Sequence, residues 1–163
     1  MKKVLLILTA FFLVVIQTSM SSSVEIIGVA PNLIFIFAIV FGLNSSTHTA
    51  TATGCLCGII SDCCDYGTIG CSALVLMYVT FLSNLASKKF YYDNKLVGIV
   101  IVFVSGLLFE SVRLFISNLM FSNASFVTVF FRYILPEAVF NSVVAFPLMW
   151  WIKWLKNEYI RGI

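Results

Sequence analysis

The residues of this chain that come nearest to a catalytic arrangement are two aspartates three positions apart, Asp62 and Asp65. Two close carboxylates can divide the roles of general acid and general base, so an intramembrane enzyme is one hypothesis. Aspartates at this spacing beside a loop are more typical of a helix end and the turn after it. Because the sequence offers no Ser/His/Asp set, no metal-ligand cluster and no phosphate-binding loop, we expect no enzymatic activity and no cofactor.

Five cysteines are the next candidates for chemistry, and they lie at Cys55, Cys57, Cys63, Cys64 and Cys71. Their odd number and their C-x-C and C-C spacings match neither a disulfide framework nor a zinc site. His48 is the single histidine, so no second histidine can share a metal ion with it. We interpret the cysteines as small, soft side chains at helix contacts, with a metal or redox role as the alternative.

The composition predicts that lipid surrounds most of the chain. Of its 163 residues, 61% are hydrophobic and 10% are charged, whereas about a quarter of a soluble domain is charged. The length suits one integral membrane domain over residues 1–163. A net charge of +3 is too small to indicate a nucleic-acid partner.

Apolar segments alternate with short polar ones, which predicts an all-α polytopic membrane bundle of about six transmembrane helices. The expected spans are residues 4–16, 26–43, 47–61, 71–87, 96–116 and 126–155. The first span follows two lysines and could instead be a signal peptide, but the absence of an Ala-x-Ala site favours a retained helix. Pro31 is expected near the start of the second helix, and residues 117–125 are expected to form a loop.

Small residues recur at every fourth position of the third expected span, at Ala50, Gly54 and Gly58, and the series ends in Asp62. In a helix this spacing leaves a bare groove on one face, which allows a second helix to approach closely. The span has few large side chains and needs neighbours to cover it. We therefore predict a helix contact along Ala50, Gly54 and Gly58.

The basic residues predict the orientation of the bundle. With six spans and a cytoplasmic N-terminus, eight of the ten basic residues fall on the inner side, namely Lys2, Lys3, Lys88, Lys89, Lys95, Lys153, Lys156 and Arg161. The outer segments hold Glu25, Asp62 and Asp65 instead. This is the positive-inside pattern, so both termini are expected in the cytoplasm.

Charged residues within the spans are costly in lipid and normally face the bundle interior or water. Glu110 and Arg113 are three residues apart and could neutralise one another. Alternatively, they line a polar cavity that opens outward. We expect Asp62, Arg132 and Pro136 to shape one surface or pocket in the outer half of the membrane, with support from Asn141 below.

Several short motifs resemble the MreD family of small bacterial rod-shape proteins. They are Pro31-Asn32-Leu-Ile near the second span, Gly54-x-x-x-Gly58-Ile-Ile-Ser-Asp62 with Gly67 and Gly70, Leu135-Pro136-Glu-Ala-Val-Phe-Asn141, and Ala145-Phe-Pro147-Leu148. Their order and spacing cover nearly the whole chain. The chain departs from the family pattern at Asn32, where an aspartate is usual, and in its Cys63-Cys64 pair and Glu137.

The resemblance implies a scaffold in the inner, cytoplasmic membrane of a bacterium. Such a protein would sit beside a bitopic MreC-like protein and help to couple the MreB filament to peptidoglycan synthases. This implies a role in cell elongation and cell-shape maintenance, in contact with the lipid bilayer.

A second hypothesis comes from another functional class. MreD-like chains are similar in size and span number to the substrate-binding S components of energy-coupling-factor vitamin transporters. An outward polar pocket would then bind a small molecule, and small residues at helical spacing would dock a transport subunit. A rise in melting temperature with a vitamin would favour transport, whereas co-purification with a MreC-like protein would favour the scaffold.

Overall fold

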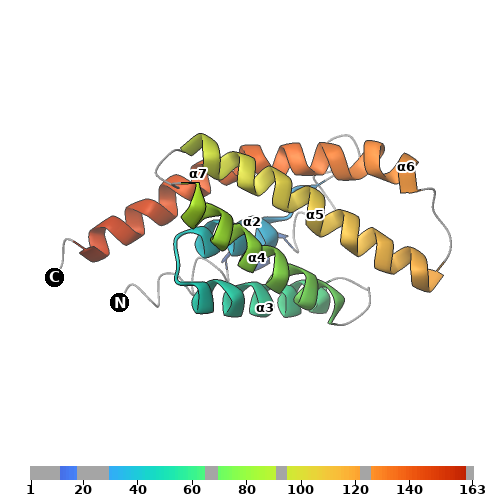
Figure 1. The fold of residues 1–163 in the computed structure, drawn as a ribbon, viewed down its shortest axis with the longest axis horizontal. Coiled ribbons are helices and arrows are strands. Elements are labelled where there is room, and N and C mark those ends of the chain that lie inside the picture. Colours follow the sequence, from blue (N-terminus) through green and yellow to red (C-terminus); the bar gives the residue numbers. More distant parts are fainter. Residues whose placement is uncertain (1–11, 18–29, 65–69, 91–94, 122–125, 161–163) are drawn as a thin grey trace.

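In a computed structural model, the chain folds as a bundle of helices (Figure 1). The structure describes residues 12–17, 30–64, 70–90, 95–121 and 126–160. After the helical residues 12–17 come α2 (Leu33–Leu43), α3 (Thr47–Cys64), α4 (Cys71–Lys89), α5 (Lys95–Phe121), α6 (Phe126–Val129), the π-helix η1 (Phe130–Ile134) and α7 (Leu135–Ile160). These ranges contain no strand, so the predicted all-α class is confirmed.

Three of the described helical stretches are long and apolar enough to cross a bilayer, namely Cys71–Lys89, Leu96–Ile116 and Val127–Trp154. Exposed apolar side chains cover much of their outer surface, as lipid-facing helices require. The chain is therefore a membrane protein. By contrast, α2 has 11 residues, or about 16 Å of helix, and is shorter than the hydrocarbon core of about 30 Å.

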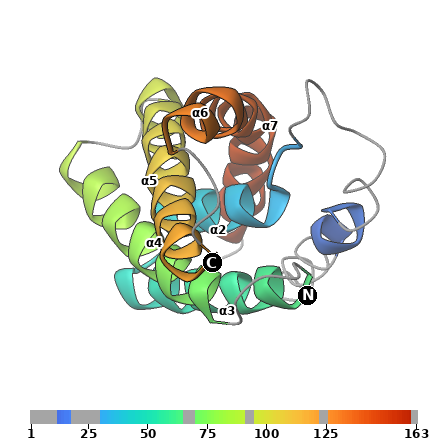
Figure 2. The ribbon, with the colours of Figure 1, turned by 90° about the vertical axis from the view of Figure 1, so that its right-hand side faces the viewer.

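The short helix α2 forms the centre of the bundle. It packs against α3, α4, α5 and α7, and Figure 2 shows it enclosed between α3, α5 and α7. Ten of its 11 residues are buried, on all sides of the helix. A helix that is apolar all round is stable only where other helices cover it, so its sequence matches its central position.

Two helix boundaries differ from those expected. The helix α2 begins at Leu33, because the Asn32 side chain accepts from the Phe35 N–H and makes Asn32 the N-cap. Residues 18–29, which include the expected start of that span, lie outside the described ranges. The prediction of a loop over residues 117–125 is wrong in its first half, since α5 continues to Phe121. No glycine or proline lies between residues 107 and 121 to stop the helix.

The last expected span is interrupted by a widened turn. The Leu135 N–H donates to the carbonyl of Phe130, five residues earlier, which is the π-helical pattern. Pro136 follows at once; it has no N–H, and its ring would clash with the carbonyl of Arg132 in a regular α-helix. The widened turn accommodates the proline at this point. Pro147 lies further along, inside α7.

The described helix ends alternate between two ends of the bundle. The α2–α3 turn, the end of α4, the start of α5 and the end of α7 gather at the left of Figure 1. A hydrogen bond of 2.6 Å from Lys88 Nζ to Thr47 Oγ1 joins two of these segments. The ends of α3 and α5 lie at the other side, together with the start of α4. This is the alternation that the predicted spans require.

Candidate functional site: polar contacts between the helices

The contact between α3 and α4 depends on two glycines. A Cβ atom on Gly58 would lie 2.4 Å from the Ala73 Cα atom, and one on Gly54 would lie 2.8 Å from the Leu76 carbonyl oxygen. Ala50, one turn before Gly54, is fully buried. All three residues of the expected stripe therefore lie on the buried side of α3, and at the two glycines the α4 backbone leaves no room for a side chain.

Asp62, on the neighbouring helix α3, caps the start of α4. Its carboxylate accepts hydrogen bonds from the backbone N–H groups of Gly70 at 2.8 Å, Ser72 at 3.1 Å and Ala73 at 3.2 Å. Gly70 is the N-cap residue of α4, at φ +93°, and has no side chain with which to cap the helix. A buried carboxylate from α3 thus satisfies donors that the first turn leaves free and faces the positive end of the helix dipole.

Three side-chain amides surround the start of α2. The Oδ1 atom of Asn32 accepts from the Phe35 N–H at 3.0 Å, and Gln17 Oε1 accepts from the Leu33 N–H at 2.8 Å. Asn141 Oδ1, from α7, accepts from the Asn32 N–H at 2.9 Å. Two residues from separate motifs, 109 positions apart in sequence, are therefore directly bonded. The contact fixes α7 against the N-terminal end of α2.

The opposite end of α2 is held by Asn84, which is fully buried on α4. Its Nδ2 atom donates to the carbonyls of Gly42 at 2.7 Å and Ser45 at 3.0 Å. Its Oδ1 atom accepts from the Thr47 hydroxyl at 3.1 Å. One side chain therefore ties α4 to the end of α2, to the following turn and to the start of α3.

Replacing Asn84 with leucine is expected to lower the free energy of unfolding by about 2 kcal/mol, because three interhelical hydrogen bonds of about 0.6 kcal/mol each are lost. Thermal unfolding of the purified protein in detergent measures the effect. The matched control is Leu85→Ala, at the exposed neighbouring position, which should change stability little. Equal melting temperatures for Asn84→Leu and wild type would show that this junction does not hold the three helices together.

Asp62 does not share a pocket with the charged residues of α5 and η1. Glu110 and Arg113 pair along α5 at 4.0 Å, with both side chains partly buried. Arg132 is exposed on η1, with its guanidinium carbon 6.0 Å from the centre of the Tyr133 ring. The Asp62 carboxylate instead faces α4, and Figures 1 and 2 show α3 and α6 on opposite sides of the bundle. The expected meeting of Asp62 with Arg132 is absent because the order of helices around the bundle separates them.

The remaining motif residues have structural positions of their own. Pro31 lies directly before the N-cap of α2, Pro136 is half-buried after the π-helix, and Pro147 is exposed on α7. Gly70 takes a left-handed backbone conformation that suits glycine. Gly67 and Asp65 fall outside the described residues.

Sequence reasoning missed Gln17, Asn84 and a buried serine pair. The hydroxyls of Ser83 on α4 and Ser105 on α5 lie 2.7 Å apart, and Ser83 also donates to the Val79 carbonyl. A polar side chain inside an apolar span was the available signal, because such residues usually bond across to another helix. The sequence does not say which helix that is.

The buried polar side chains described above bond to neighbouring helices and turns. Within the described ranges, no group of three His, Cys, Asp or Glu side chains could hold a metal ion. The Asp62 carboxylate accepts from backbone N–H groups, and the Glu110 carboxylate pairs with Arg113.

Comparison with known proteins identifies one family. The family model described as "rod shape-determining protein MreD" matches residues 1–158. No curated protein and no solved structure matches the chain.

Proposed function

We propose a function from the family, since the chain belongs to the MreD family of rod shape-determining proteins. The protein is a non-enzymatic membrane subunit of the bacterial cell-elongation complex. In this role it couples a bitopic MreC-like protein, and through it the MreB filament, to peptidoglycan synthases. The observation that carries the proposal is the family match over residues 1–158.

The use of the buried polar side chains supports a scaffold. Asp62, Asn84 and Asn141 are each buried and bonded to the backbone of another helix or turn. Side chains engaged in this way fix the positions of helices, which is what a scaffold needs in order to present a constant surface.

A partner surface is proposed around the start of the last span, in the outer half of the membrane. Arg132 is exposed there, and Pro136 sets the widened turn that presents it. On the neighbouring α5, the Glu110–Arg113 pair adds further polar groups. Arg132→Ala should therefore weaken retention of the partner while leaving the protein folded.

We propose that the protein lies in the inner membrane and that both of its termini are in the cytoplasm. Lys88 and Lys89 end α4, and three exposed tryptophans near the end of α7 suit a membrane interface, namely Trp150, Trp151 and Trp154. Cys63 is exposed at the opposite end, on α3.

This orientation predicts that a membrane-impermeant thiol reagent labels Cys63 when it is added to intact spheroplasts. Cys57 is buried and should stay protected. The control is the double variant Cys63→Ser, Cys64→Ser, which should lose the rapid labelling. Labelling of Cys63 only after the inner face is exposed would overturn the proposed orientation.

The partner proposal is tested by purifying the chain from native membranes in mild detergent and identifying bound proteins by mass spectrometry. A bitopic MreC-like protein is expected with the wild type, and less of it with Arg132→Ala. Recovery of a transport ATPase instead, together with a rise in melting temperature in the presence of a vitamin, would favour the S-component hypothesis and contradict the scaffold.

A further inference from the structure

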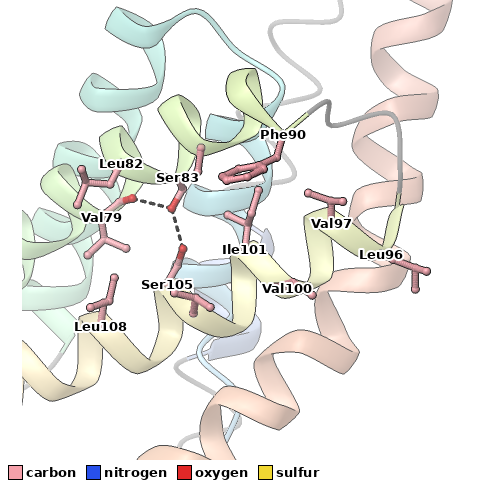
Figure 3. Close-up of a pocket in the computed structure, with 12 residues that line it drawn as sticks. Val79, Leu82, Ser83, Phe90, Leu96, Val97, Val100, Ile101, Ser105 and Leu108 are labelled. Carbon is pink, nitrogen blue, oxygen red and sulfur yellow. Dashed lines mark hydrogen bonds between the residues drawn. The ribbon is translucent and has the colours of Figure 1, made fainter.

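A groove with a volume of about 520 Å³ runs along the outer surface between α4 and α5. Figure 3 shows its walls, with Phe90 and Leu96 at one end and Val79 and Leu108 at the other. Ten of the 12 lining residues are apolar. The two others, Ser83 and Ser105, satisfy one another's hydroxyls and offer no free donor to an occupant.

The length of the groove matches one leaflet of a bilayer. From Leu96 to Leu108, α5 rises by about 18 Å, and from Val79 to Phe90, α4 rises by about 16 Å. Half of a hydrocarbon core is about 15 Å. A transmembrane helix of a partner or a second copy would cross about twice that depth, so the groove suits a lipid chain better than a helix.

A positive charge stands at the end of the groove that meets the membrane surface. Lys89 is exposed and lies three and seven residues after Ala86 and Leu82, which places it on the same face of α4 as these two lining residues. Lys88 belongs to a different face, since its Nζ atom bonds to Thr47 of α3. A lysine beside the mouth of an apolar groove complements a lipid whose headgroup is anionic.

We propose that the groove between α4 and α5 binds one anionic phospholipid, with an acyl chain along Val100 and Val104 and the headgroup phosphate at Lys89. Such a lipid would fill the seam between the two helices on the side where Ser83 and Ser105 join them. Lipid binding at this groove does not depend on which protein the chain binds.

The test uses the full chain in phosphatidylcholine vesicles that contain a small fraction of phosphatidylglycerol with a photoreactive group in its acyl chain. Cross-linked peptides are identified by mass spectrometry, and photoreactive phosphatidylcholine at the same fraction serves as the neutral lipid. The expected result is that phosphatidylglycerol labels the groove residues of α4 and α5 more strongly than phosphatidylcholine does.

Two pairs of variants make the test specific. Val104→Trp fills the groove and should reduce labelling severalfold, whereas Val112→Trp, two turns along α5 at a similarly exposed position, should not. Lys89→Gln should reduce phosphatidylglycerol labelling about fivefold, the value of one cation near the membrane surface, and Lys88→Gln should change it little. Thermal unfolding confirms that each variant is folded.

Three results would overturn the proposal. Equal labelling by the two lipids would mean that the groove does not select an anionic headgroup. Equal losses in the two lysine variants would assign the preference to general surface charge rather than to a site. Disulfide cross-linking between two copies of a Val100→Cys or Val104→Cys variant would assign the groove to self-association.

Discussion

Gly58→Leu is expected to prevent α3 and α4 from packing and to remove most of the folded protein. A Cβ atom at this position would already lie 2.4 Å from Ala73 Cα and 2.6 Å from the Ser72 carbonyl oxygen. Both are backbone atoms, so no change of rotamer relieves the clash and the two helices must separate. Overpacking of this kind costs about 3 kcal/mol or more, and a separation would also strain the hydrogen bonds of Asp62.

Folded protein after detergent extraction, measured by gel filtration and thermal unfolding, gives the size of the effect. Gly106→Ala is the matched control, because a Cβ atom on that α5 glycine would meet Ala138 at an ordinary 3.6 Å. Gly58→Ala should already be destabilising, whereas Gly106→Ala should be close to neutral. Wild-type yield and stability for Gly58→Leu would exclude the close contact between α3 and α4.

The second large effect is expected for Asp62→Ala. This change leaves the N–H groups of Gly70, Ser72 and Ala73 without their acceptor, and those of Ser72 and Ala73 are buried. Hydrogen bonds to a charged group contribute about 1.5–3 kcal/mol each, and they are not additive. A total loss of about 3–5 kcal/mol in the free energy of unfolding is therefore expected.

Asp62→Asn removes the charge of the side chain and keeps its shape. Its free energy of unfolding should lie between those of wild type and Asp62→Ala, because it keeps one side-chain oxygen. Cys63→Ala, at the exposed neighbouring position, controls for changes at the end of α3. Thermal unfolding in detergent orders the variants. If Asp62→Ala and Cys63→Ala have the same melting temperature, the carboxylate does not hold the start of α4.

The close contact on α3 could be predicted from the sequence because it depends on local spacing. Small residues at Ala50, Gly54 and Gly58 place a groove on one helix face whatever the neighbour is. The helical, membrane-embedded class followed from composition in the same way. Neither prediction depends on the order of the helices around the bundle.

The partners of the polar side chains could not be predicted, because they depend on that order. The expected depth of the two residues in the membrane suggested that Asp62 meets Arg132. In the structure α4 packs against α3, and the Asp62 carboxylate binds the start of α4. The bond between Asn32 and Asn141 joins residues 109 positions apart, and no local pattern marks such a pair. Pro136 was expected to shape a surface, and the sequence did not predict the π-helix that accommodates it.

The most direct test of the central claim is the shape of cells depleted of this protein. We expect depleted cells to lose their rod shape and become round, measured as the ratio of length to width, and wild-type protein supplied in trans to restore it. Arg132→Ala, folded but weak in partner binding, should restore it only in part. Cells that stay rod-shaped and elongate at a normal rate without the protein would contradict the account.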